Sequence, residues 1–457
     1  MLMDQNRLIK NQIKFEKRKY LFLLDYYDNH PLGIIYDWIR SKPAKETIIL
    51  KHLDYLPYCK SGKYKLSKDN FLKVFYKFIR IHSILTYLKS IGYKIIDIDK
   101  LTKQDLSLDE IKSKVTVPGI IENEIIRDFI CQKDRQSSYL SIRKNHIFKD
   151  YQSSTKILWK KYIKIIKNLS IEYNIDSSYI FNGRALRQKL ISNLLRENKI
   201  DVFYIERNMW NKGRTIKTKE RVQSFGYLST DQCLDYGSSY TDINVEELFE
   251  NVMKKSWSKM QVDSFNRESS KQKLISYMSG SSDEYLAFTN EVMLDNCSSQ
   301  IKLVDFISRN CLKNGIDFVL RVHPNTRNKS DLDIDFWNSI GRVIESRGHN
   351  FFSATSNINT YSIINESDAI ITISSTVAVE SCLQGKNVCL CGFSGLRKYN
   401  AALIPTMLEE IKEFILERNP DRAPSEVIKA AKRYLSDELQ SGRTLSHYSM
   451  DKERFYL

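Results

Sequence analysis

The fold is decided by the stretch Asp317-Phe-Val-Leu-Arg-Val322, a short apolar run that stops at His323-Pro324. One such run precedes it at 273–278, and three follow it at 350–352, 368–373 and 387–391. Each run is separated from the next by a segment long enough for a helix. Short apolar runs that alternate with helices indicate a parallel sheet covered on both faces. The pattern of residues 269–404 therefore predicts a doubly wound α/β domain.

The same alternation begins near the amino terminus with the apolar run Tyr20-Leu-Phe-Leu-Leu24. Further strand-like runs lie at 47–50, 93–98, 178–183 and 201–206. A chain of 457 residues has room for two such domains. The sequence thus predicts an α/β protein of two Rossmann-like domains that face a cleft. The first spans 1–268 and carries a helical insertion at about 101–173, the second spans 269–404, and C-terminal helices in 405–457 pack back on the first.

Charge is distributed unevenly along the chain. Residues 1–100 carry 20 Lys and Arg against 10 Asp and Glu, whereas residues 281–380 carry 8 against 13. A basic half suits an anionic membrane leaflet, an anionic glycan or nucleic acid. The alternative is that the lysines only solvate helices, as in proteins from AT-rich genomes. No apolar run reaches the length of a bilayer span, so we expect a cytoplasmic protein, with peripheral contact to the inner membrane as an option.

The eight cysteines are scattered through the chain and form no pattern of metal ligands. Cys389-Leu-Cys391 is the one close pair, and it lies inside an apolar run without a second pair or a nearby histidine pair. Structural zinc sites need four ligands at short, regular spacings. We therefore expect reduced, mostly buried thiols.

Ligands of parallel sheets bind beyond the carboxyl ends of the strands, so the residues that follow each run are the candidates for function. Arg321 and His323 alternate with apolar residues at the end of one run, and Asn325 follows Pro324. A histidine and an arginine on one face can bind a phosphate oxygen. The alternative for His323 is an ordinary strand-end histidine with a satisfied hydrogen bond.

Hydroxyl residues follow the next run but one, in Ser374-Ser-Thr-Val-Ala-Val-Glu380. Ser374, Ser375 and Thr376 have the look of a strand end that opens a helix, where backbone N–H groups suit a phosphate. Glu380, one turn later, suits the hydroxyls of a ribose. The alternative is that a serine here is a common helix cap.

A general base for an acceptor hydroxyl requires a carboxylate at a strand end of the other domain. Asp25 is the leading candidate and Glu206 the second; Asp283 and Glu284 are candidates on the second domain. Asn182, Arg184 and Arg207 also follow strand-like runs and suit a sugar or phosphate of the acceptor. The alternative for each carboxylate is a helix cap or a first-turn residue.

The order Arg-x-His-Pro, then Ser367-Asp-x-x-Ile-Thr-x-Ser-Ser-Thr-x-x-x-Glu-x-x-x-x-Gly-Lys386, resembles capsule polysaccharide and surface-glycan glycosyltransferases, including Kdo- and sialyl-type enzymes and O-antigen proteins. The resemblance covers roughly residues 179–399. It implies a GT-B-like fold, a nucleotide-sugar donor bound through His323, Ser374 to Thr376 and Glu380, and a bacterial capsule or lipopolysaccharide glycan, free or lipid-linked, as acceptor. A CMP-linked acidic sugar is favoured, with UDP and GDP sugars as alternatives.

Nothing in the sequence resembles the DxD motif of a GT-A-type loop, so we expect no obligatory metal and no cofactor besides the donor. Asp331, Asp333 and Asp335 follow a loop and are interpreted as a solvated helix start. Two other functions remain open. One is a CDP-alcohol phosphotransferase of the teichoic-acid type. The other is a non-enzymatic basic binding protein, although no nucleic-acid-binding module is recognisable and we expect no nucleic-acid partner.

Overall fold

The computed structural model describes about half of the first predicted domain and most of the second. The described residues are 19–24, 29–52, 68–98, 146–183, 186–208, 213–218, 263–267, 272–280, 294–297, 299–328, 331–373, 375–392, 394–417, 424–440, 442–449 and 454–456. Within them, no helix is long and apolar enough to cross a membrane.

Seven strands form the first sheet, in the order β12-β6-β5-β4-β1-β2-β3. Its parallel strands are β1 (Lys19–Leu24), β2 (Thr47–Lys51), β3 (Lys94–Asp97), β4 (Ile175–Phe181) and β5 (Asp201–Arg207). β6 (Arg214–Thr218) runs antiparallel to β5, and β12 (Arg443–Thr444) runs antiparallel to β6. β1 and β2 are nearly continuous apolar runs, as expected of strands that are buried on both faces, whereas β3 is only partly buried.

The second sheet has five parallel strands in the order β11-β10-β7-β8-β9. They are β7 (Leu274–Met278), β8 (Asp317–Arg321), β9 (Asn350–Phe352), β10 (Ala369–Thr372) and β11 (Asn387–Leu390). Numbered along the chain from its first parallel strand, each sheet has the order 5-4-1-2-3. The predicted α/β class with two Rossmann-like halves is therefore confirmed, whereas a cleft between the halves stays a prediction.

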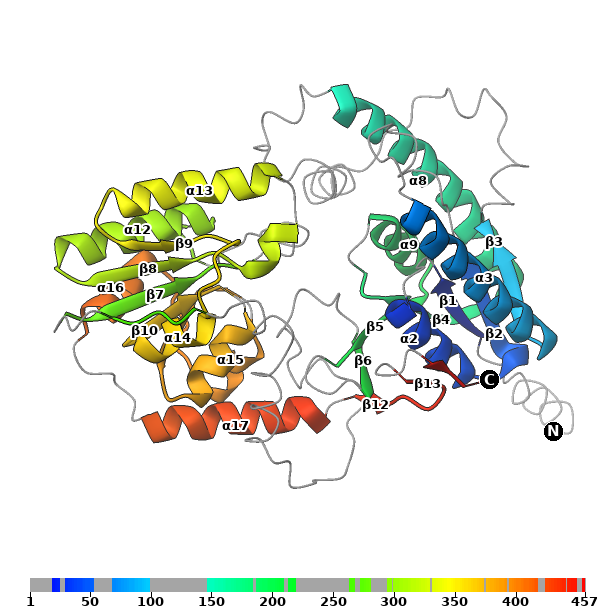
Figure 1. The fold of residues 1–457 in the computed structure, drawn as a ribbon. Coiled ribbons are helices and arrows are strands. Elements are labelled where there is room, and N and C mark those ends of the chain that lie inside the picture. Colours follow the sequence, from blue (N-terminus) through cyan, green and yellow to red (C-terminus); the bar gives the residue numbers. More distant parts are fainter. Residues whose placement is uncertain are drawn as a thin grey trace, which may run out of the picture.

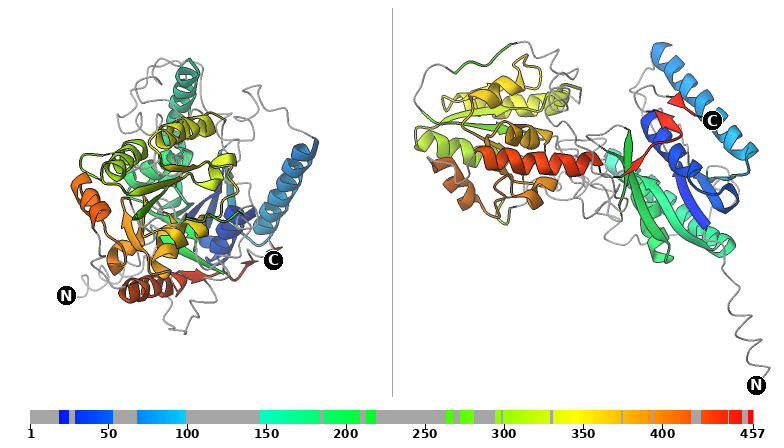
Figure 2. Two further views of the ribbon diagram at one scale, coloured as in Figure 1. Left: turned by 60° about the vertical axis from the view of Figure 1, so that its left-hand side comes forward. Right: turned by 90° about the horizontal axis from the view of Figure 1, so that it is seen from below.

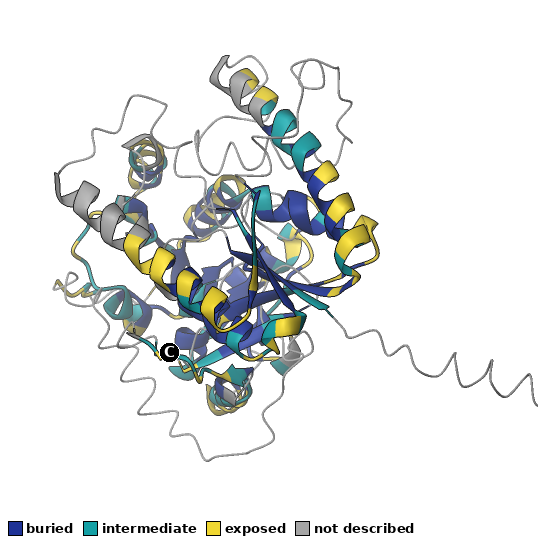
Figure 3. Ribbon diagram, turned by 90° about the vertical axis from the view of Figure 1, so that its right-hand side faces the viewer, coloured by how far each residue is buried: buried dark blue, intermediate teal, exposed yellow. Residues whose placement is uncertain are grey.

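Helices cover both faces of each sheet (Figure 1). On the first sheet, α2 (Asn29–Arg40) and α3 (Lys68–Ser90) pack on one face, and α8 (His146–Tyr173) and α9 (Leu186–Glu197) on the other. β1 serves both cores, since Leu21 and Leu23 belong to one and Phe22 and Leu24 to the other. Figure 3 shows the buried strands inside and exposed residues along the outer sides of the helices.

On the second sheet, α12 (Gln300–Lys313), α13 (Asp331–Glu345) and α16 (Leu408–Leu416) cover one face. α14 (Thr360–Glu366), α15 (Thr376–Leu383) and α17 (Pro424–Gln440) cover the other. α13 begins at Asp331, which agrees with the predicted helix start. None of the five cysteines among the described residues forms a disulfide, and all five are buried, as expected: Cys297, Cys311, Cys382, Cys389 and Cys391.

α8 is the described part of the predicted helical insertion, and it is integral to the first core. Trp159, Tyr162, Ile166 and Leu169 point from it into the apolar cluster that includes the strands β1, β2 and β4. Residues 99–145, the rest of the segment before α8, lie outside the described residues.

α17 connects the two halves. Its apolar side belongs to the second core, through residues such as Val427 and Leu435, and Figure 2 shows it extending from the second half toward the first. In its last turn, the Glu438 carbonyl accepts a hydrogen bond from the Asn208 amide of the first half at 2.5 Å. The chain then forms β12, β13 (Tyr448–Ser449) and β14 (Arg454–Phe455). The last residues thus join the first half, and they do so as short strands and loops while α16 and α17 stay on the second core.

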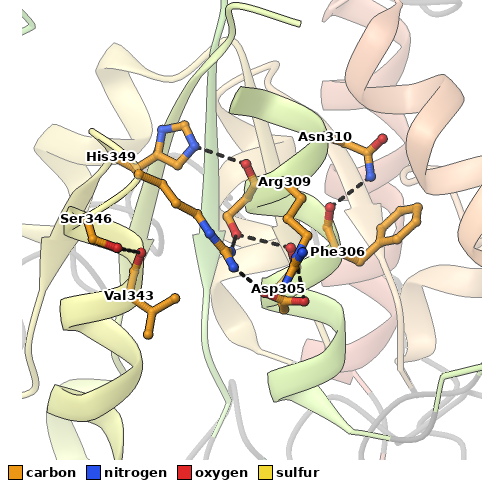
Figure 4. A network of polar contacts seen from close by, with 9 residues as sticks. Asp305, Phe306, Arg309, Asn310, Val343, Ser346 and His349 are labelled. Carbon is orange, nitrogen blue, oxygen red and sulfur yellow. Dashed lines mark hydrogen bonds and ion pairs between the residues drawn. The ribbon is translucent and has the colours of Figure 1, made fainter. Parts of the chain in front are cut away.

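A polar network fastens α12 to the end of α13 and the start of β9 (Figure 4). The Asp305 carboxylate accepts hydrogen bonds from Arg347 at 2.6 Å and from Arg309 at 2.9 Å. His349 Nε2 donates to the Ser308 carbonyl at 3.0 Å. Burial alone would raise the pKa of Asp305, but the arginine hydrogen bonds outweigh it and lower the pKa. Burial lowers the pKa of His349.

Acid is expected to weaken the second half. A group whose pKa is lower in the folded state stabilises the fold above its unfolded pKa, and that stabilisation is lost as the pH falls. For His349 the loss begins below its ordinary value of 6.5. Between pH 7.5 and 5.5, His349→Gln, which keeps a donor and cannot titrate, should reduce the fall in melting temperature by about 2–4 °C.

Melting curves at the two pH values test this expectation, with His82→Gln on the exposed side of α3 as the control. The pKa of His447 is also lowered, by burial and by Arg40 and Arg443, so His447 too makes the protein less stable as the pH falls. The contribution of His349 is therefore measured as the difference in pH dependence between His349→Gln and the wild type. Equal pH dependence of the wild type and His349→Gln would contradict the assignment.

Candidate functional site

The second sheet has its topological switch point between β7 and β10. From β7 the chain proceeds to β8 on one side, whereas from β10 it proceeds to β11 on the other. Helices that leave two neighbouring strands in opposite directions open a crevice at their carboxyl ends, where α/β proteins bind ligands. Ser279 and Gly280 follow β7 at this point, and Ser375 follows β10.

His323 is fixed beside the end of β7 through its backbone. Its N–H donates to the Ser279 hydroxyl oxygen at 2.8 Å, and the Ser279 N–H donates to the Arg321 carbonyl at 3.0 Å. The carbonyl of His323 accepts from the Thr326 N–H at 2.9 Å, within the short helical turn Pro324–Asn328. The His323 side chain is half-buried. A rigid backbone with a partly exposed imidazole suits a residue that donates to an anion.

Gly280 is held by the first residue of α12. The Gln300 side-chain oxygen accepts from the Gly280 N–H at 2.9 Å and from the Tyr277 hydroxyl at 3.3 Å, while its amide donates to the Gly280 carbonyl at 3.3 Å. Gln300 is buried. The loop after β7 therefore begins in a defined position beside His323.

α15 begins at the switch point with an ordinary cap. The Ser375 hydroxyl accepts from the Val377 N–H at 3.3 Å. The capping alternative is thus confirmed for Ser375. A cap uses the side chain of the serine and leaves other first-turn N–H groups of the helix without helical acceptors. A phosphate contact of Ser375 and Thr376 stays a prediction, and Ser374 lies outside the described residues.

Glu380 lies in the first turns of α15 and is buried, with 5% of its surface exposed. It accepts a hydrogen bond from the Tyr361 hydroxyl of α14. Burial and the Glu380 carboxylate raise the pKa of Tyr361, so the phenol remains a donor at neutral pH. A ribose contact by Glu380 stays a prediction, and it would have to share the carboxylate with Tyr361.

Arg321 has a different role from the predicted one. Its side chain is 1% exposed and donates to the carbonyls of Ser353, Ser356 and Ile358 at 2.5, 3.4 and 3.3 Å. Burial lowers the pKa of Arg321 to about 10, which leaves it charged at neutral pH. The expectation of a nucleotide contact is corrected, because the guanidinium points into the sheet face covered by α14 and fastens the loop after β9.

Asn182 and Glu206 meet at the carboxyl edge of the first sheet. The Asn182 amide donates to the Glu206 carboxylate at 2.5 Å, and the Arg207 N–H donates to the other carboxylate oxygen at 2.9 Å. Each of the two side chains is 8% exposed. Asn182 has a φ of 62°, and the Gly183 N–H donates to the Phe181 carbonyl at 2.6 Å. This is a γ-turn of the rare, strained form, which is often associated with functional sites.

The side-chain oxygen of Asn182 is buried without a hydrogen-bond partner. An unsatisfied buried acceptor costs about 1–3 kcal/mol, so this edge is a second candidate contact point for a hydroxyl or a water. Arg207, next to Glu206, is exposed and keeps its predicted place at the strand end.

The remaining predicted site residues cannot be placed. Asp25, Arg184, Asp283 and Glu284 lie outside the described residues, as does the side chain of Asn325. Among the described residues, no group of three or more His, Cys, Asp or Glu side chains is arranged to hold a metal ion. The expectation that the protein needs no metal is not tested by this.

Comparison with known proteins gives no family. No family model matches the sequence, and no curated protein matches it. Among solved structures, KpsC from Thermosulfurimonas dismutans, a β-Kdo 2,7-transferase, shares 12% identity over 58% of this chain and 79% of its own, with a TM-score of 0.32.

Two further structures match over nearly the whole chain. A UDP-GlcNAc 2-epimerase from Neisseria meningitidis shares 11% identity over 93% of this chain and 100% of its own, with a TM-score of 0.28. A glycosyltransferase from Rickettsia africae shares 12% over 94% of this chain and 95% of its own, with a TM-score of 0.29. At such values similarity decides nothing about chemistry, and the fold assignment rests on the strand orders above.

Three residues of the site were not predicted from the sequence: Ser279, Gln300 and Tyr361. Ser279 follows an apolar run, so the rule that singled out His323 also applies to it. Gln300 and Tyr361 do not follow an apolar run. Each lies on a helix, and its contacts depend on where that helix packs.

Proposed function

We propose that the protein is a glycosyltransferase that moves a sugar from a nucleotide-activated donor to a growing bacterial surface polysaccharide. The observation that carries the proposal is the convergence of His323, Ser279 and the start of α15 at the switch point of the second sheet. A half-buried imidazole and a helix N-terminus at the same carboxyl edge of a sheet suit the phosphate of a nucleotide. The favoured donor is a CMP-linked acidic sugar.

The first half is proposed to bind the glycan acceptor. Its switch point lies between β1 and β4, so the residues after these two strands are the candidates. Asp25 directly follows the last residue of β1 and stays the leading candidate for the base that accepts the proton of the acceptor hydroxyl. Glu206 is the second, and its two hydrogen bonds would hold its carboxylate in place.

The test is a thermal-shift panel with CMP, UDP, GDP and CDP on the wild type and on His323→Ala. A charge-assisted hydrogen bond contributes about 1.5–3 kcal/mol, so we expect at least a tenfold weaker nucleotide affinity in the variant. His82→Ala, on an exposed side of α3, is the matched control. Undiminished binding by His323→Ala would remove this histidine from the site, and a preference for UDP or GDP would remove the CMP donor.

A second candidate is a CDP-alcohol phosphotransferase, because the same histidine at a strand end can donate to the phosphate of either donor. Turnover of CDP-glycerol in a donor screen, with no transfer from nucleotide sugars, would select this function over glycosyl transfer.

A further inference from the structure

The outward side of α8 carries isoleucines and lysines in one stripe. Ile163, Lys164, Lys167 and Ile171 recur at helical spacing and are all exposed, while the opposite side of the helix belongs to the first core. Ile171 is 75% exposed, the highest value for a large apolar side chain among the described residues, and Ile163 is 40% exposed. We call these four residues the α8 stripe.

A basic aromatic cluster lies at the end of the same helix, where Tyr173 packs against the first core. Lys94 and Lys19 lie over the ring of Tyr173, with their ammonium nitrogens 4.1 and 5.5 Å from its centroid. Lys94 also donates to the Tyr173 hydroxyl. Two exposed carboxylates, Glu172 and Asp176, are close in sequence, so lysines outnumber acidic residues on this surface.

We propose that the α8 stripe is a docking surface for an anionic phospholipid bilayer, with Lys94 and Lys19 adding positive charge at the end of the helix. Lysines near the surface are attracted to anionic headgroups, and their aliphatic stems can accompany the isoleucines into the interface. The cores of protein interfaces, in contrast, are depleted in lysine, and here lysines separate the two isoleucines.

The position of the surface is compatible with catalysis at the other end of the sheet. α8 leads into the first residue of β4, so the Tyr173 cluster lies at the amino edge. The candidate residues Asn182 and Glu206 follow the carboxyl ends of β4 and β5. Docking through this surface therefore leaves the carboxyl edge of the first sheet uncovered.

The experiment is co-sedimentation of the full chain with vesicles of phosphatidylglycerol and phosphatidylethanolamine, compared with phosphatidylcholine alone. At about 0.1 M salt we expect binding to the anionic vesicles, a loss of about tenfold in partition for the double variant Lys164→Glu, Lys167→Glu, and release at about 0.5 M salt. Ile171→Ser should weaken binding by about threefold while leaving the salt dependence in place.

The controls are Lys302→Glu and Leu312→Ser on α12, which change exposed residues of the second half. Both should bind as the wild type does, and melting curves should show all variants folded. The proposal is overturned if the wild type does not sediment with anionic vesicles, if it binds phosphatidylcholine equally well, or if the α8 and α12 variants behave alike. Because no donor or acceptor takes part, the result is independent of the proposed glycosyl transfer.

Discussion

Replacement of Asp37 by alanine is expected to release the C-terminal segment from the first half. Asp37 lies in α2 and is completely buried. Its carboxylate forms an ion pair with Arg443 and accepts from the backbone N–H of Ser446 at 2.7 Å and from that of His447. Removal of one partner from a buried pair leaves an uncompensated charge and typically costs about 3–5 kcal/mol. We expect a loss of this size in the free energy of unfolding of the first half.

Urea unfolding curves measure the loss, and limited proteolysis reports whether the segment after 440 becomes accessible. Asp335→Ala on the exposed side of α13 is the control. The double variant Asp37→Ala, Arg443→Met should be less damaged than Asp37→Ala alone, because no charge stays buried. An unchanged urea midpoint in Asp37→Ala would show that the ion pair does not hold the segment.

Replacement of Arg321 by methionine is expected to destabilise the second half by about 2–4 kcal/mol, since hydrogen bonds from charged donors contribute about 1.5–3 kcal/mol each and the relief of a buried charge offsets part of the loss. The carbonyls of Ser353, Ser356 and Ile358 would lose their shared donor. The stability of Arg321→Lys should lie between those of the wild type and Arg321→Met, because a single ammonium cannot span three carbonyls.

Chemical denaturation with a reporter in the second half tests this expectation, and Arg342→Met on exposed α13 is the control that should stay within about 0.5 kcal/mol of the wild type. If Arg321→Met were as stable as the wild type, the loop after β9 would not depend on the guanidinium, and the corrected role of Arg321 would have to be withdrawn.

The parallel strands could be predicted because each one is marked by a short run of apolar residues in the sequence. The predicted run 317–322 compares with β8 at Asp317–Arg321, and the run 387–391 with β11 at Asn387–Leu390. Strands buried on both faces need apolar residues at almost every position, which any short window of sequence shows. The helices between them followed from the same alternation.

The edge of the first sheet could not be predicted. β6 has the sequence Arg-Thr-Ile-Lys-Thr, which contains no apolar run that would indicate a strand, and β12 has only two residues. Both are stabilised by pairing with partners, and β12 pairs with a strand very far away in the sequence. No local pattern carries that information.

The candidate site was predictable in its positions and less so in its contacts. Strand ends pointed to His323 and Ser375, which do lie beside the switch point. The alternation along β8 could not tell that a loop of carbonyls covers the face that carries Arg321. In the same way the sequence favours a ribose contact for Glu380, whereas its bond to Tyr361 depends on where α14 packs.

The pairing of β12 with β6 has a consequence for synthesis of the chain. A ribosome completes β1 to β6 long before Arg443 and Tyr448 leave the exit tunnel, so β6 emerges as an uncovered sheet edge and α2 lacks the ring that packs on Gly33. Open edges invite pairing with other chains. The half that is made first is therefore expected to finish folding last. A truncation before Arg443 should increase aggregation of the nascent protein, while the second half keeps its stability.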